Sequence, residues 1–345
     1  MTNLHQRARI MQSQLISKPS FFSKQTMGYL AILLASILWG TTGTVASFAV
    51  DVSASSIAAI TTGGGGLLLF LSALPHYKGS LVVWRKNIPL TLLAVLCITC
   101  YPLAFYTSMQ LSGVAIGTVV SIGSAPIASA IIERTVEKVP LTTRWMMACI
   151  LGLIGVTMLS IATHLNIEET TNLNAKQTLQ SVQGIALGII AGITYACYSW
   201  SAKRLISKEL CSKTVMGVLF GLASMLLLPI AVQDSASFLS SWHNSMIGLY
   251  LAVIPMFFGY RLFGYGLSHS RVSTATTLTL FEPVVATILS IVIVGEILST
   301  QAWFGLALIL TSLLVIMLPH KWLSATKSRY GRISSKRRIS ADNTR

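Results

Sequence analysis

The chain has 345 residues, of which 53% are hydrophobic and only 10% are charged. Charged residues make up roughly a quarter of soluble domains, so this composition, with a mean hydropathy of +0.70, excludes an ordinary soluble protein. The net charge of +15 is typical of some nucleic-acid-binding proteins, but eight of the basic residues follow Met317 in a tail with almost no aromatic residues. We therefore expect a membrane protein without nucleic-acid binding, whose basic tail attracts anionic lipid head groups.

Ten apolar stretches are long enough to cross a bilayer, which requires about 20 residues per helix. In chain order, the predicted membrane spans are residues 28–50, 54–74, 88–108, 114–132, 143–163, 184–202, 214–232, 246–267, 273–294 and 302–319. The residues before the first span are polar and basic, which fits an uncleaved signal anchor better than a cleaved signal peptide. The predicted fold class is an all-α integral membrane protein with ten transmembrane helices.

The distribution of Lys and Arg predicts the orientation of these helices. When the loops are assigned alternately to two sides, one side receives 23 of the 25 Lys and Arg residues and the other receives only Lys176. The remaining residue, Arg261, lies inside a span. Cytoplasmic loops of membrane proteins are enriched in Lys and Arg, so we expect a multi-pass protein of the cytoplasmic membrane with both termini inside the cell.

The two halves of the chain resemble each other. Residues 28–49 match residues 184–205, and the fourth and ninth spans each carry a proline, Pro126 and Pro283, among small and hydroxyl residues. Five spans per repeat is an odd number, so the second repeat is expected to be inverted, as in many secondary transporters. The predicted organisation is a cytoplasmic tail (1–26), a first five-helix repeat (27–163), an external linker (164–183), a second five-helix repeat (184–320) and a basic cytoplasmic tail (321–345).

Several motifs resemble one known family. Leu38–Gly40 in the first span, Ala125–Pro126 in the fourth, and Leu280–Pro283 followed by Val294–Glu296 are similar to motifs of the EamA-type drug/metabolite transporter superfamily. The resemblance covers residues 27–320. It implies two inverted five-helix repeats around a central cavity in a prokaryotic cytoplasmic membrane. It also implies export or exchange of amino acids and other small metabolites.

Two charged residues lie well inside the predicted spans, away from their ends: Arg261 in the eighth and Glu282 in the ninth. Charges within the membrane are costly and are therefore candidates for function. Counted from the turn near Ser268–Arg271 at about 1.5 Å per residue, Arg261 lies roughly 8 Å deep and Glu282 roughly 13 Å deep, so their side chains are expected within reach of each other.

Three interpretations of this pair are open. The two residues form a permanent salt bridge, or they bind the carboxylate and ammonium groups of a substrate, or Glu282 takes up and releases a proton during transport. Pro283 follows Glu282 directly and removes a backbone hydrogen bond near Thr279. A broken backbone is tolerated in the membrane only where protein or water satisfies it, so both Pro126 and Pro283 are predicted to break helices at the cavity.

Aromatic residues deep in the spans are the remaining site candidates. We expect them to line a cavity formed by spans one, three, four, six, eight and nine and to hold the apolar part of a substrate; plain helix packing is the alternative. These residues are Trp39, Tyr101, Tyr106, Tyr195 and Tyr198.

The usual parts of an enzyme are missing from the spans. All six histidines fall in tails, loops or span ends, and there is no metalloprotease motif, no pair of membrane aspartates and no phosphate-binding loop. We therefore expect no catalysis, metal or cofactor. The predicted function is a secondary transporter, an exporter or exchanger of small metabolites such as amino acids that works by alternating access; the alternative is a passive channel or facilitator for a small polar solute. The sequence does not set the oligomeric state.

Overall fold

The computed structural model describes residues 23–76, 81–165, 175–208, 210–233, 241–294 and 299–318. Within these ranges there are ten helices long and apolar enough to cross a membrane and no β-strand, which confirms the predicted all-α class and the number of spans. The basic tail at 321–345, the first 22 residues and Glu296 lie outside the described residues.

The first five spans are continuous α-helices. They are α2 (Lys24–Ala46), α3 (Ala54–Ala73), α5 (Ile88–Ser112), α6 (Val114–Thr135) and α7 (Thr143–Leu165). A short 3₁₀ turn, η1 (Leu74–His76), and the helix α4 (Leu81–Lys86) lie between α3 and α5.

The last five spans include two that are interrupted. The sixth, seventh and tenth spans are α8 (Ala175–Ile206), α9 (Ser212–Gln233) and α15 (Thr300–Met317). The eighth span consists of α11 (Trp242–Leu251), the π-helical η2 (Ala252–Phe258) and α12 (Gly259–Ser268). The ninth consists of α13 (Val272–Leu278), the 3₁₀ segment η3 (Thr279–Phe281), α14 (Glu282–Leu289) and the π-helical η4 (Ser290–Val294).

Local sequence explains where several helices begin. A serine precedes α2, α3, α11 and α15, and its side chain accepts a hydrogen bond from a backbone N–H of the first turn, which would otherwise have no partner. The largest difference from a predicted span boundary is at the start of the sixth span. Helix α8 begins at Ala175 rather than near residue 184, so it takes up the second half of the expected linker, a stretch rich in the good helix formers Ala, Lys, Gln and Leu.

The helices of the two halves pack in pairs that correspond to each other. Helix α5 packs against α8 as α12 packs against α2, and α6 packs against α8 as α14 packs against α2. Each member of one pair lies five spans from its counterpart in the other. The second and seventh spans, α3 and α9, pack together, as do the fifth and tenth, α7 and α15. Duplication of a five-helix unit predicts this correspondence between the contacts of the two halves.

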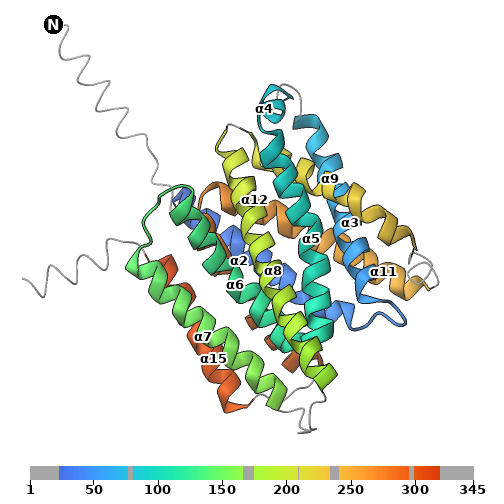
Figure 1. Cartoon of the computed structure of the whole chain (residues 1–345), viewed down its shortest axis with the longest axis vertical. Helices are drawn as coiled ribbons and strands as arrows, with labels where there is room; N and C mark the ends of the chain where they lie inside the picture. Colours follow the sequence, from blue (N-terminus) through green and yellow to red (C-terminus); the bar gives the residue numbers. More distant parts are fainter. Residues whose placement is uncertain are drawn as a thin grey trace, which may run out of the picture.

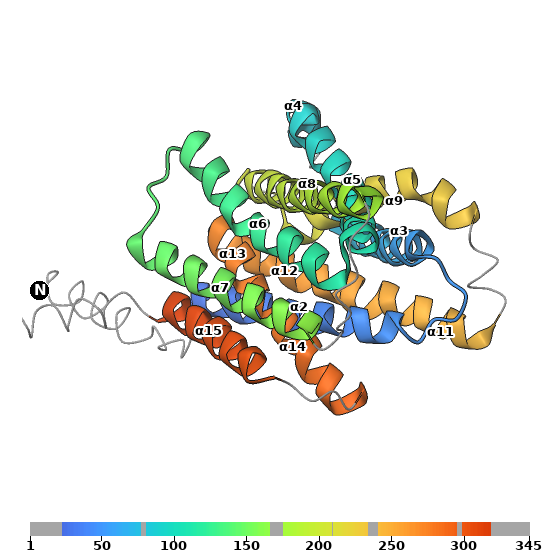
Figure 2. The same ribbon diagram turned by 60° about the horizontal axis from the view of Figure 1, so that its bottom comes forward.

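Helices α7 and α15 lie side by side at the edge of the bundle (Figures 1 and 2). Gly155 and Gly305 allow their close approach, because a Cβ on either residue would lie 2.7 Å from the other's carbonyl oxygen. Close backbone contact of this kind is a principal source of helix association in lipid. The remaining eight spans surround the centre of the molecule.

Candidate functional site

A cavity of about 260 Å³ lies among these eight central spans. The predicted spans one, three, four, six, eight and nine all contribute to its wall. The prediction missed spans two and seven, which add Thr61 and Thr62 from α3 and Phe220 from α9. Within the described ranges, α7 and α15 contribute no residue to it.

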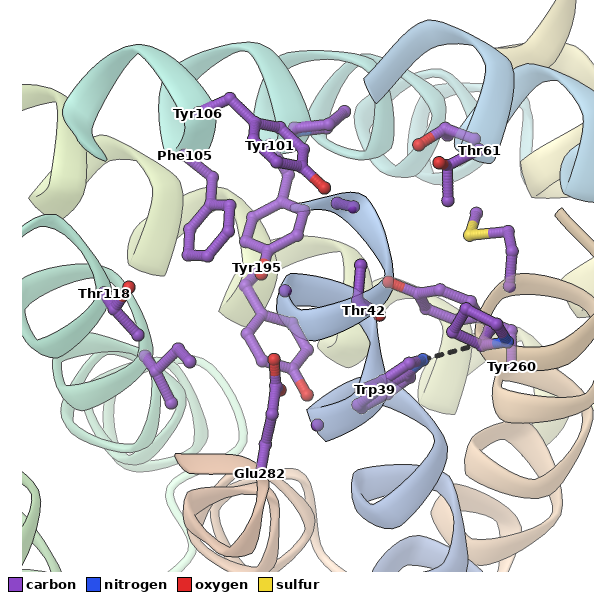
Figure 3. Close-up of a pocket in the computed structure, with 18 of the residues that line it drawn as sticks. Trp39, Thr42, Thr61, Tyr101, Phe105, Tyr106, Thr118, Tyr195, Tyr260 and Glu282 are labelled. Carbon is purple, nitrogen blue, oxygen red and sulfur yellow. Dashed lines mark hydrogen bonds between the residues drawn. The ribbon is translucent and has the colours of Figure 1, made fainter. Parts of the chain in front are cut away.

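The five aromatic residues singled out in the sequence all lie on the cavity wall (Figure 3 shows Trp39, Tyr101, Tyr106 and Tyr195). Three of their rings are in contact: the Tyr195 and Tyr198 rings stack with centroids 5.3 Å apart, and the Tyr101 and Tyr195 centroids are 5.5 Å apart. The structure therefore brings α5 and α8 together through these side chains, whereas Trp39 of α2 contacts Tyr260 of α12. Their role in substrate binding stays a prediction.

Three further aromatic residues on the wall, Phe105, Phe220 and Tyr260, were missed as candidates. Phe220 and Tyr260 have ring centroids only 4.2 Å apart, and Tyr260 is 9% exposed. Depth within a span was the only available signal, and it does not distinguish a wall residue from a packed one.

Trp39 is held in place by the π-helical segment of the eighth span. Its indole N–H donates to the carbonyl oxygen of Pro255 at 2.9 Å, and its ring centroid lies 4.9 Å from that of Tyr260. A π-helical segment shifts the hydrogen-bond register of a helix and is frequent at functional sites. The indole ring is thus held against the eighth span of the second repeat.

The ninth span breaks where Pro283 predicts it. The 3₁₀ segment η3 covers Thr279–Phe281, directly before Glu282 and Pro283, and the Tyr195 hydroxyl donates to Thr279 Oγ1 at 3.3 Å. Pro283 also lines the cavity. For Pro126 the prediction was wrong: α6 stays helical through this residue, which is buried and does not line the cavity. Helix α6 packs against α8 along its length.

The expected contact between Arg261 and Glu282 was also wrong. The Arg261 Nη1 atom donates to Ser72 Oγ at 3.1 Å, and the guanidinium lies 5.6 Å from the centre of the Phe257 ring, so Arg261 is outside the cavity wall. Successive residues of a helix point about 100° apart. Tyr260 faces the cavity, so the adjacent Arg261 points away from it, toward Ser72 of α3. Helix α2 packs against both α12, which carries Arg261, and α14, which carries Glu282.

Glu282 itself lies on the cavity wall at the first turn of α14, with its carboxylate directed into the cavity (Figure 3). In the part of the chain that the structure describes, this carboxylate has no hydrogen-bond or ion-pair partner; the one ion pair there is Arg204–Glu137. The site thus combines one acidic group, a few threonine hydroxyls and a largely aromatic wall. Among the described residues, no three His, Cys, Asp or Glu side chains come together as metal ligands.

Comparisons with known proteins agree with this architecture. Residues 26–161 and 182–318 each match the model of the EamA-like transporter family. The chain is 33% identical over 293 residues to the uncharacterized transporter YwfM of Bacillus subtilis (strain 168), covering 83% of this chain and 92% of the relative. It is 26% identical to the uncharacterized inner membrane transporter YicL of Salmonella typhimurium, covering 84% of this chain and 95% of that relative.

One solved structure, titled only "Crystal structure of protein", has the same fold. It superposes with a TM-score of 0.69 at 17% sequence identity, covering 84% of this chain and 95% of the solved one. At this identity the likeness concerns the fold alone.

Proposed function

The chain belongs to the EamA-like transporter family, and on this premise we propose that it is a secondary transporter of small amphipathic metabolites that works by alternating access between two inverted repeats. Export or exchange is the proposed direction. Amino acids and related amines are the proposed substrates, by family resemblance and by the mixed chemistry of the cavity. The single observation that carries the proposal is one aromatic cavity with a single acidic group, enclosed by spans of both halves.

The position of the cavity supports alternating access. Its wall includes Ala46 at the end of α2, and Met109 and Thr118 on either side of the α5–α6 turn. The cavity therefore extends toward the end of the bundle that carries this turn. From the distribution of Lys and Arg, we assign that end to the outside of the cell.

The opposite end is closed by hydrogen bonds between the two halves. Glu133 at the end of α6 accepts hydrogen bonds from the backbone of Val272 and Ser273 at the start of α13. Arg144 of α7 donates to the carbonyl oxygens of Val315 and Ile316 at the end of α15. A carrier must break such contacts to expose its site to the second side, whereas a passive channel has no need of them.

The proposal is tested by comparing the metabolites that accumulate in the medium of cells expressing the wild type, Glu282→Gln or the control Glu137→Gln at equal membrane abundance. We expect at least one small metabolite to accumulate with the wild type and the control and to fall to the background level with Glu282→Gln, because only Glu282 lies on the cavity wall. Equal accumulation with all three proteins would remove Glu282 from the transport path. No change with any of them would contradict metabolite export.

Carrier and channel are then distinguished in proteoliposomes with the metabolite so identified. A carrier gives saturable uptake that is accelerated by the same compound on the opposite side of the membrane. Uptake that is linear with concentration and insensitive to the opposite side would favour the channel.

A further inference from the structure

We propose that the cavity selects an amphipathic organic cation, an amine without a free carboxylate, whose positive charge pairs with Glu282 and whose apolar part lies against the tyrosine-rich wall. This inference rests on the proposed transport function and narrows its substrate class.

The charge of the cavity wall is the first argument. Glu282 is its single charged side chain among the described residues, and its carboxylate has no partner there. A lone charge within the membrane is costly. A cationic ligand that enters the cavity supplies the missing partner, and the interaction is strengthened by the low dielectric of the surroundings.

The position of Arg261 is the second argument. An amino acid carries a carboxylate as well as an ammonium group, and the first of these needs its own donor or positive charge. Arg261, which lies within the eighth span, is directed to Ser72 and Phe257 instead of into the cavity. Among the described residues, the wall therefore offers a substrate carboxylate threonine hydroxyls but no cationic side chain. A carboxylate bound beside Glu282 would also be repelled by it.

The aromatic wall is the third argument. Ammonium groups are attracted to the faces of Trp and Tyr rings within about 6 Å of the ring centre, and this attraction is larger where water is excluded. Among the described residues, six such side chains line the cavity. The six residues are Trp39, Tyr101, Tyr106, Tyr195, Tyr198 and Tyr260.

The hydrogen bonding of this wall also favours rings as the recognition surface. The Tyr195 hydroxyl donates to Thr279, the Tyr198 hydroxyl to Tyr260, and the Trp39 indole N–H to Pro255. These polar atoms already have partners within the protein, so recognition by the aromatic wall falls to the ring surfaces that line the cavity rather than to these hydroxyl and indole N–H groups. The volume of about 260 Å³ is near the lower limit of about 300 Å³ for small-molecule sites and favours a small amine with one ring or a short chain.

The test uses the purified full-length protein in lipid nanodiscs and three probes with one phenol ring each. Tyramine carries an ammonium group, tyrosine adds a carboxylate to it, and tyrosol replaces the ammonium group by a neutral hydroxyl. At pH 7 we expect calorimetry to give binding of tyramine about tenfold or more tighter than that of tyrosine or tyrosol, the equivalent of one favourable charge interaction.

Variants assign this preference to the carboxylate. Glu282→Gln is expected to weaken tyramine binding about tenfold while tyrosol binding stays within about twofold. Glu282→Asp keeps the charge and should keep the preference for tyramine, which separates a loss of charge from a loss of folding. Glu137→Gln, outside the cavity wall, is the matched control and should bind all three probes as the wild type does.

The outcomes separate this inference from the transport proposal. Tyrosine binding equal to or tighter than tyramine binding overturns the choice of amine, and uptake of tyrosine into proteoliposomes would then leave the transport function standing. Binding of tyramine without flux in proteoliposomes keeps the cation site and contradicts the transporter. Equal tyramine binding by the wild type and Glu282→Gln, or no binding of any probe by monodisperse protein, overturns the inference.

Discussion

At one end of the helical bundle, a buried carboxylate of the first half, Glu133, accepts hydrogen bonds from the second half; at the other end, a neutral amide, Asn244, joins the two halves. Glu133 is 3% exposed and accepts from the Val272 N–H at 2.7 Å, from the Ser273 N–H at 3.3 Å and from the Ser273 hydroxyl. Asn244 is 4% exposed and bonds both the N–H and the carbonyl oxygen of Val50, at 3.2 and 2.9 Å. Figure 2 shows α11, which carries Asn244, beside the segment between α2 and α3.

The difference between the two ends concerns how strongly each is closed. Hydrogen bonds to charged groups contribute about 1.5–3 kcal/mol each and those between neutral groups about 0.5–1.5 kcal/mol. The end with Glu133 is also held by Arg144, whereas the cavity extends toward the end with Asn244. The structure is thus closed firmly on one side of its cavity and lightly on the other. Substitutions that remove the hydrogen bonds of Glu133 or of Asn244 test this difference.

The largest effect is expected from Glu133→Ala. It removes three hydrogen bonds and leaves the N–H groups of Val272 and Ser273 unsatisfied, so we expect the free energy of unfolding to fall by about 2–4 kcal/mol. The closed end should open more often as a result. A cysteine in place of the buried Ser129 on α6, in a background without the five native cysteines, should then react faster with a membrane-impermeant thiol reagent.

Glu137→Ala is the control for this experiment, since it removes a more exposed acid from the same end. If labelling at position 129 is as slow in Glu133→Ala as in the control, Glu133 does not close this end of the bundle.

A smaller effect is expected from Asn244→Ala at the opposite end. Two neutral hydrogen bonds to Val50 are lost, which should cost about 1–2 kcal/mol. Because this end is already the lightly closed one, transport should continue, and a cysteine at Met109 on the cavity wall should be labelled modestly faster. His243→Ala, which removes one exposed contact to Phe48, is the matched control and should change labelling less. If Asn244→Ala lowered the free energy of unfolding more than Glu133→Ala does, the end with Asn244 would be the more firmly closed one.

The number, type and approximate limits of the spans were predictable because each needs about 20 apolar residues and leaves its charges in the loops. The aromatic wall was largely predictable as well, since Trp39, Tyr101 and Tyr195 lie deep in their spans. The side of the helix on which Arg261 lies was not, because span length carries no information on rotation about the helix axis.

Two further features of the structure could not be predicted from the sequence. The 3₁₀ segment at Thr279–Phe281 turns by about 120° per residue, and so changes the direction of Glu282 from that of a regular helix. The hydrogen bonds of Glu133 join residues far apart in the chain, and the sequence offered no signal for them. Glu133 looked like an ordinary loop acid at the end of a span.

The smallest effect is expected from Glu137→Gln, which lies outside the cavity wall and only four residues from Glu133. Its carboxylate lies 4.0 Å from Arg204, and the two side chains are 34% and 44% exposed. Exposed ion pairs contribute about 0–1 kcal/mol, and the glutamine oxygen can still accept the hydrogen bond of the Trp200 indole N–H. Thermal unfolding in detergent should therefore match the wild type, as should the labelling of position 129. If this variant opened the end as far as Glu133→Ala does, the total negative charge at that end would hold the halves together, and the buried hydrogen bonds of Glu133 would have no special part in it.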